Sequence, residues 1–321
     1  MAEGTKLAGE LPGDPRPMTG IALKVSSVAI FVGMSSFIKA AGQTPSGQIV
    51  FFRSLFAVVP ILVFLAYRRE LLTALHTSRP LSHIARGVVG VSSMALSFYG
   101  LTRLPLPDAI AINYAQPLIV VVFSAVFLGE TIRVFRWSAV AVGLVGVFII
   151  SWPKLTLFSS GADIGRAQAY GAAALLIAAA ISAVAMLLVR RLVTTEKSST
   201  IVLWFSLTAT VCSLMTLPFG WENLSRDQVI FLVAAGFCGG IAQILMTESY
   251  RHADVSTIAP FEYTSILLGI GVGYVFFGDV PTIHMIVGAA IVVAAGIFII
   301  WREQRLGLER GAARKVTPPQ G

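Results

Sequence analysis

Three ionisable side chains lie inside long apolar stretches of this 321-residue chain: Arg53, Glu248 and Glu262. A charged side chain at the centre of a membrane span costs about 3 kcal/mol on insertion scales and commonly faces a cavity or an opposite charge. Each is therefore a candidate for binding a ligand or an ion. Glu262 is the strongest candidate, because it lies about two turns inside its stretch. Glu248 precedes Arg251 by three residues, a spacing that favours a structural ion pair.

Arg53 allows two interpretations. It lies about two turns from the predicted end of its apolar stretch, so its aliphatic stem would let the guanidinium reach the interface without a partner. If the side chain faces inward instead, its natural partner is an anionic group of a substrate or a carboxylate such as Glu262.

Polar residues near Glu262 have counterparts earlier in the chain. Asn113 and Gln116 are three residues apart and share one face of a helix, and Glu262 and Ser265 share a face in the same way. A proline lies beside each face and frees a backbone carbonyl group, and these prolines are Pro117 and Pro260. The candidate substrate-binding residues are Glu262, Asn113, Gln116, Tyr114, Tyr263, Ser265, Gln243 and Arg53. The alternative is that these side chains form hydrogen bonds that hold packed helices together.

Sequence patterns of enzymes are absent. The chain contains no HExxH, GxxxxGK[ST] or GxSxG motif, and its four histidines are scattered. Cys212 and Cys238 lie inside apolar stretches, where a cysteine is ordinarily a small buried hydrophobe. We therefore expect no catalytic residue, no metal and no cofactor.

The elements that position these residues are membrane spans. Hydrophobic residues make up 56% of the chain and charged residues only 12%, about half the charged fraction of a soluble domain. Stretches of roughly 20 residues, the length needed to cross a bilayer, are predicted at 21–39, 48–67, 87–104, 109–128, 134–152, 170–189, 201–219, 229–250, 255–277 and 283–301. The fold class is thus all-α integral membrane protein with ten transmembrane helices.

The two halves repeat at an offset of 149 residues, which places Tyr114 on Tyr263 and Trp152 on Trp301. Five spans per half make the repeats inverted in the bilayer, the design of secondary transporters. The predicted organisation is a disordered cytoplasmic tail (1–20), a first repeat (21–152), a periplasmic linker (153–169), a second repeat (170–301) and a basic cytoplasmic tail (302–321). Small residues in the fifth and tenth spans, Gly143 to Gly146 and Gly288 to Ala290, suit close helix packing and indicate a scaffold.

The basic residues indicate how the chain sits in the membrane. The net charge is +8, and Lys and Arg cluster at the ends of alternate spans, which predicts that both termini are cytoplasmic. Short clusters at span ends do not form the single basic face expected for nucleic-acid binding. We therefore expect a multi-pass protein of the inner (plasma) membrane, in contact with lipid and not with nucleic acid.

Local signatures resemble one transporter family over residues 20 to 302. They are Phe52-Arg53, His83-Ile84-Ala85-Arg86-Gly87, Phe127-Leu128-Gly129-Glu130, Tyr250-Arg251, Ala259-Pro260-Phe261-Glu262-Tyr263 and Phe277-Gly278-Asp279-Val280-Pro281. The chain resembles EamA-type members of the drug/metabolite transporter superfamily. The resemblance implies spans one to four and six to nine around a central cavity, with spans five and ten more peripheral. It also implies a metabolite substrate, such as an amino acid, a vitamin like riboflavin, or S-adenosylmethionine.

We expect a secondary-active carrier of a small organic metabolite (amino acid, vitamin or nucleoside-like) that works by alternating access, as a monomer or a homodimer. Glu262 would bind a cationic or hydrogen-bond-donating group, or accept a coupling proton, because burial of a carboxyl group favours its neutral form. The alternatives are a non-transporting membrane scaffold or regulator and, among carriers, uptake of S-adenosylmethionine or riboflavin rather than export. A channel is disfavoured, since no ring of like charges repeats along the chain.

Overall fold

The computed structural model describes the backbone of residues 17–128, 134–155, 163–192, 195–196, 198–252 and 258–316, and all regular elements in these ranges are helical. The helices are α1 (Pro17–Ala40), α2 (Ser46–Tyr67), α3 (Pro80–Leu101), α4 (Leu106–Asn113), α5 (Ala115–Leu128), α6 (Val134–Leu155), α7 (Asp163–Leu192), α8 (Ser198–Leu214), α9 (Arg226–His252), α11 (Thr264–Phe277) and α12 (Ile283–Val316), with 3₁₀ segments η2 (Leu217–Phe219) and η3 (Ala259–Tyr263).

Each of the ten predicted spans corresponds to one helix or to a broken pair. Within the described ranges, eight spans are long and apolar enough to cross a membrane, and one of them is formed by α4 and α5 together. Ser199–Leu214 and Phe261–Phe277 are shorter apolar helices. The all-α membrane fold predicted from hydropathy is therefore confirmed. Backbone hydrogen bonds are satisfied within each helix, which is what lets such a segment lie in hydrocarbon.

Several span boundaries differ from the prediction. Helix α3 begins at Pro80, not at residue 87, because a polar first turn with two arginines nearby hides its start from a hydropathy criterion. Helix α1 begins at Pro17, inside the tail predicted to be disordered, and α12 continues to Val316 through most of the predicted basic tail. Residues 1–16, 317–321 and part of the predicted linker (156–162) lie outside the described residues.

The most extensive helix contacts between the two halves are preserved when the halves are exchanged. Helix α1 packs on α9, and its repeat counterpart α7 packs on α3; α2 packs on α9, and its counterpart α8 packs on α3. The pairs α2–α8 and α6–α12 each join a helix to its own counterpart. This exchange symmetry is what two inverted five-span repeats related by a two-fold axis would give.

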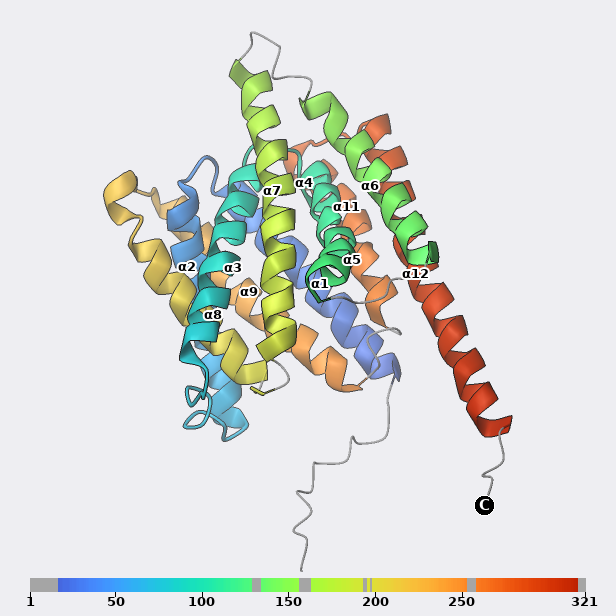
Figure 1. Ribbon diagram of the computed structural model, residues 1–321. Coiled ribbons are helices and arrows are strands. Elements are labelled where there is room, and N and C mark those ends of the chain that lie inside the picture. Colours follow the sequence, from blue (N-terminus) through green and yellow to red (C-terminus); the bar gives the residue numbers. More distant parts are fainter. Residues whose placement is uncertain are drawn as a thin grey trace, which may run out of the picture.

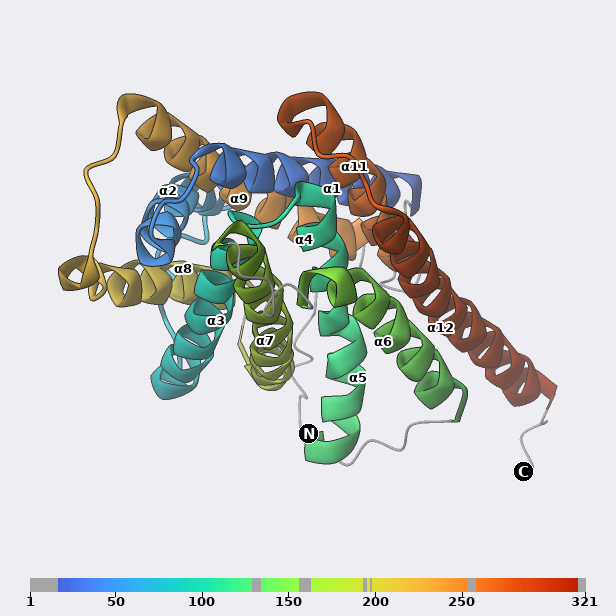
Figure 2. The ribbon, with the colours of Figure 1, turned by 90° about the horizontal axis from the view of Figure 1, so that it is seen from above.

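Helices α6 and α12 lie together at one edge of the bundle, opposite α2 and α8, in both views (Figures 1 and 2). Gly146 and Gly288 face each other there, and a Cβ atom added at Gly146 would lie 2.8 Å from the carbonyl oxygen of Gly288. Such close backbone approach is possible only for small residues. The prediction that the fifth and tenth spans form a packed, peripheral scaffold is confirmed.

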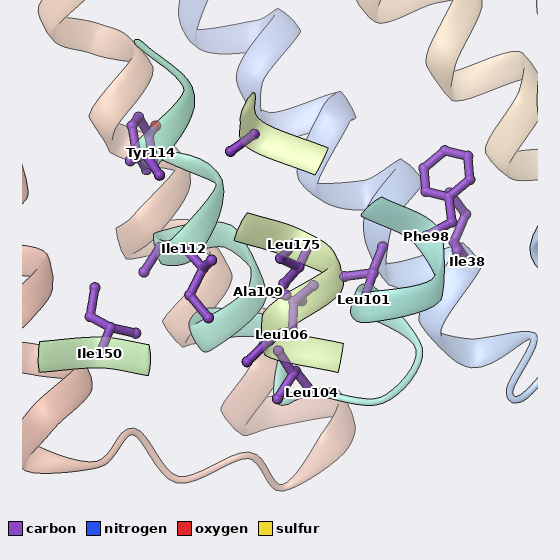
Figure 3. Close-up of a cluster of buried hydrophobic side chains, with 14 of the residues drawn as sticks. Ile38, Phe98, Leu101, Leu104, Leu106, Ala109, Ile112, Tyr114, Ile150 and Leu175 are labelled. Carbon is purple, nitrogen blue, oxygen red and sulfur yellow. The ribbon is translucent and has the colours of Figure 1, made fainter. Parts of the chain in front are cut away.

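The apolar core draws buried residues from α2, α5, α8, α9, α11 and α12 and includes the region where α1, α3, α4, α6 and α7 meet. Figure 3 shows Ile38, Leu101, Leu106, Ile150 and Leu175, one from each of these helices, gathered around the start of α4. Because lipid tails are as apolar as these side chains, the cluster stabilises the bundle by close packing rather than by removal from water. The core thus holds helices of the two halves together, with α8, α9, α11 and α12 contributing as well as α7.

Candidate functional site

Both polar faces predicted from the sequence lie at breaks in helices. Helix α4 ends at Asn113, Tyr114 forms a turn, and α5 begins at Ala115. Pro117 has no N–H group for the carbonyl of Asn113, which explains a break at this point. Pro260 lies at the start of the 3₁₀ segment η3, which leads into α11. The predicted proline distortions are therefore confirmed, and each leaves a tyrosine at the break.

The two tyrosines meet across the interface between the halves. The rings of Tyr114 and Tyr263 stack with their centroids 4.9 Å apart. The Tyr114 hydroxyl donates a hydrogen bond to the backbone carbonyl of Glu262 (2.6 Å) and forms a second hydrogen bond with the Ser265 hydroxyl (2.6 Å). The Tyr263 hydroxyl instead lies against Gly296 of α12. Residues related by the repeat thus form one cluster with unequal hydrogen bonding.

Glu262 is less enclosed than predicted and carries a nearby cation. Its side chain is 55% exposed, and its Oε2 lies 3.5 Å from Nζ of Lys24, which is only 2% exposed. The sequence analysis overlooked Lys24, although its charge inside the predicted span 21–39 is a signal that would have found it. Asn113 is exposed and Gln116 partly buried, and neither makes a hydrogen bond or ion pair with another side chain among the described residues.

A cavity of about 50 Å³ lies between α2, α3, α8 and α9. It is lined by Arg53, Ala57, Ile61, Arg86, Val202, Phe205, Ser206, Gly239 and Gln243. Two lining pairs, Arg53 with Val202 and Ala57 with Ser206, are separated by the repeat offset of 149 residues, so the cavity straddles the internal symmetry axis. Two of the eight candidate residues, Arg53 and Gln243, line it, and the other six are not among its described lining residues.

Arg53 faces the interior rather than the membrane interface. Its side chain lies beside Gly239, where an added Cβ atom would be 3.2 Å from Nε, and the residue is 9% exposed. Arg86 reaches the same cavity from α3, with its guanidinium 3.8 Å from the centroid of the Phe205 ring. Arg86 is absent from the candidates because the predicted third span began one residue after it.

Ion pairs tie the ends of the bundle together. At the end predicted to face outside, Lys39 pairs with Asp279 (2.6 Å), and Asp108 pairs with Lys154 (3.4 Å). The first pair joins α1 of the first half to the end of α11 in the second. At the opposite end, Glu248 pairs with Arg68 of α2 (3.3 Å). The structural ion pair expected for Glu248 is thus present, while the side chain of its predicted partner, Arg251, lies outside the described residues.

The known proteins that this chain resembles are transporters. The model of the EamA-like transporter family matches residues 18–152 and 169–302. The pseudopaline exporter CntI of Pseudomonas aeruginosa is 28% identical over 87% of this chain and 95% of its own length. The riboflavin transporter of Rhizobium johnstonii is 29% identical (81% and 83% covered), and an S-adenosylmethionine uptake transporter of Rickettsia conorii is 26% identical (81% and 84%).

A solved crystal structure with 18% sequence identity has a TM-score of 0.62 and covers 90% of this chain and 99% of the other, which shows a shared fold. The family model covers most of both halves, in agreement with the internal repeat. The chain therefore belongs to the EamA-like transporter family and is a multi-pass membrane transporter rather than an enzyme.

Proposed function

We propose that the chain is a secondary carrier that moves a small organic metabolite by alternating access. The observation that carries this proposal is the cavity between α2, α3, α8 and α9, which is lined by repeat-related residues of both halves. A site on the axis between two inverted repeats is opened to either side when one half rocks against the other. A non-transporting scaffold would need packed helices but no cavity at this position.

The ion pairs at the two ends supply the closing contacts that such a cycle requires. Lys39 and Asp279 join the halves at one end, and Arg68 and Glu248 do so at the other. Opening one end breaks its pair while the other stays closed. Each pair therefore stabilises the closed state of its own end.

We assign Glu262 to coupling or to binding of a cationic group. Its carboxylate is accessible, and Lys24 is close enough to neutralise it between transport events. A proton or an ammonium group arriving at Glu262 would compete with Lys24 for the same oxygen atoms. Glu262→Gln should then abolish flux driven by a proton gradient and spare exchange of substrate; unchanged proton-driven flux would contradict this role.

The substrate belongs to the range of amino acids, vitamins and nucleoside-like metabolites. Relatives named for export and for uptake are similarly distant from this chain, so uptake is kept as the alternative direction. The experiment is counterflow in proteoliposomes preloaded with single unlabelled compounds, namely amino acids, riboflavin, S-adenosylmethionine and nucleosides. A carrier accumulates the labelled form of its substrate transiently, whereas a scaffold accumulates none and a channel only equilibrates it.

A further inference from the structure

Resting on the proposed carrier function, we propose that the transported metabolite carries an anionic oxygen group, a carboxylate or a phosphate, which binds between Arg53 and Arg86. The site is the cavity between α2, α3, α8 and α9. The proposal depends on the burial of the two guanidinium groups, on their unpaired N–H groups and on the composition of the cavity wall.

Arg53 is held in the interior, and none of the described residues gives it a carboxylate as an ion-pair partner. Its Nε atom is buried and has no hydrogen-bond partner among the described residues. The absence of a side chain at Gly239 leaves room for the guanidinium, because a Cβ atom there would lie 3.2 Å from Nε and 3.5 Å from Nη2. A charge taken out of water is strongly unfavourable unless it is paired. A bound anion would supply the missing partner.

Arg86 approaches the same space from the neighbouring helix. Its Nε and Nη1 atoms are buried and without hydrogen-bond partners in the described part of the chain. Stacking of the guanidinium on Phe205 of α8 orients the plane of the group and provides no acceptor for these two donors. Arginine presents these donors as a planar fork that matches the oxygens of a carboxylate or a phosphate.

The wall of the cavity favours a negative ligand. Its described lining residues include two guanidinium groups, the Ser206 hydroxyl and the Gln243 amide, and no carboxylate. Glu248, on the same helix as Gln243, is engaged by Arg68. Two positive charges that repel one another therefore share a space in which the described side chains offer hydrogen bonds but no negative charge.

The size and position of the cavity suit one charged group rather than a whole metabolite. A single water occupies roughly 10–15 Å³ on a comparable measure, so about 50 Å³ admits a carboxylate or a phosphate. Complete small-molecule sites are several times larger, at roughly 300 Å³ or more. The arginines come from α2 and α3, whereas Phe205, Ser206 and Gln243 come from α8 and α9. A bound anion would therefore contact both halves, and the rest of the substrate would extend beyond the cavity.

Binding of matched compounds to the purified, full-length protein tests the proposal. The thermal unfolding midpoint is measured with succinate against succinamide, with glycerol 3-phosphate against glycerol, and with putrescine, at constant ionic strength set with potassium chloride. A ligand that binds only the folded protein raises the midpoint. We expect a rise with at least one of the two anions and none with its neutral analogue or with putrescine, and the responding anion distinguishes carboxylate from phosphate.

Variants separate binding from a structural role. In Arg53→Met and Arg86→Met, the apparent Kd for the anion should rise about tenfold or more, while the midpoint without ligand stays the same or rises, because an unpaired buried charge has been removed. Arg103→Met is the matched control, since Arg103 packs on Tyr99 outside the cavity, and it should retain the response to anions.

The inference is overturned if neutral compounds or putrescine stabilise the protein as well as the anions do, if no anion stabilises it, or if the anion effect survives in Arg53→Met. Counterflow distinguishes this failure from that of the carrier proposal. Counterflow of cationic or neutral compounds alone would leave the carrier function standing and remove the anionic substrate, whereas absence of counterflow and of alternating access would remove both.

Discussion

Replacing Asp279 with asparagine should open the end of the bundle that is predicted to face outside. Asp279 lies 2.6 Å from Lys39, with the two side chains 16% and 14% exposed, and it also accepts a hydrogen bond from the Leu106 N–H. Loss of one partner of a fully buried pair costs about 3–5 kcal/mol. Partial exposure, and the Leu104 carbonyl that Lys39 retains as an acceptor, reduce this to about 2 kcal/mol. If the pair is absent from the outward-open state, that state becomes about thirtyfold more populated.

The assay is the rate at which a membrane-impermeant maleimide labels Ile110→Cys from outside, in a chain whose Cys212 and Cys238 are replaced by alanine. Ile110 of α4 packs against α11 of the other half, so a cysteine there is reached only when the halves separate. Asp279→Asn should increase the rate about thirtyfold. Asp108→Asn is the matched control, because its ion pair joins α4 to α6 within one half. An unchanged rate in Asp279→Asn, or an equal increase in the control, would refute the reasoning.

Three further predictions concern packing and the loops. Tyr114→Phe should destabilise the protein by about 1 kcal/mol, seen as a lower thermal midpoint, whereas Tyr263→Phe should leave it unchanged because that hydroxyl makes no hydrogen bond to the described residues. Gly146→Leu should lower the midpoint by separating α6 from α12, since its Cβ meets the rigid carbonyl of Gly288; an unchanged midpoint would refute the close packing. Hydrogen bonds from a threonine and a serine of the α2–α3 loop lower the pKa of Glu196, so this contact is present above the ordinary carboxyl pKa and is lost as pH falls through the lowered value. The protection factors of the amides of residues 77–79, which are exchange rates corrected for the intrinsic dependence on pH, should therefore fall on acidification and be low at every pH in Glu196→Gln.

The fold could be predicted because its signals are local and repeated. Ten apolar stretches have the length of a span, and an odd number in each half leaves inversion as the only arrangement. The repeat offset also pairs Tyr114 with Tyr263, and the two rings stack in the structure. Small residues predicted close helix packing by the fifth and tenth spans, and Gly146 and Gly288 are in contact in the structure. The starts of α1 and α3 were harder to predict from hydropathy, because each helix begins with a proline and has polar residues in its first turns.

The site could be predicted only in part, because side-chain direction depends on helix rotation. The sequence places Arg53 within a span and leaves the direction of its side chain open. Its contact with Gly239 follows from how α2 packs on α9. Arg86 resembles the other basic residues at span ends, and only the early start of α3 carries it to the cavity. Glu262 was expected to be a buried carboxyl group that binds substrate or a proton, whereas the structure leaves its side chain 55% exposed beside Lys24 and away from the described cavity.

Alternating access of the cavity itself is the most direct test of the carrier proposal. Ser206 lines the cavity, and Ser206→Cys in the same cysteine-free background can be labelled with an impermeant maleimide from either side of oriented vesicles. The account predicts labelling from both sides, with Asp279→Asn increasing the outer rate and lowering the inner rate. The account would be contradicted if one side gave no labelling, or if Asp279→Asn raised the outer and inner rates together.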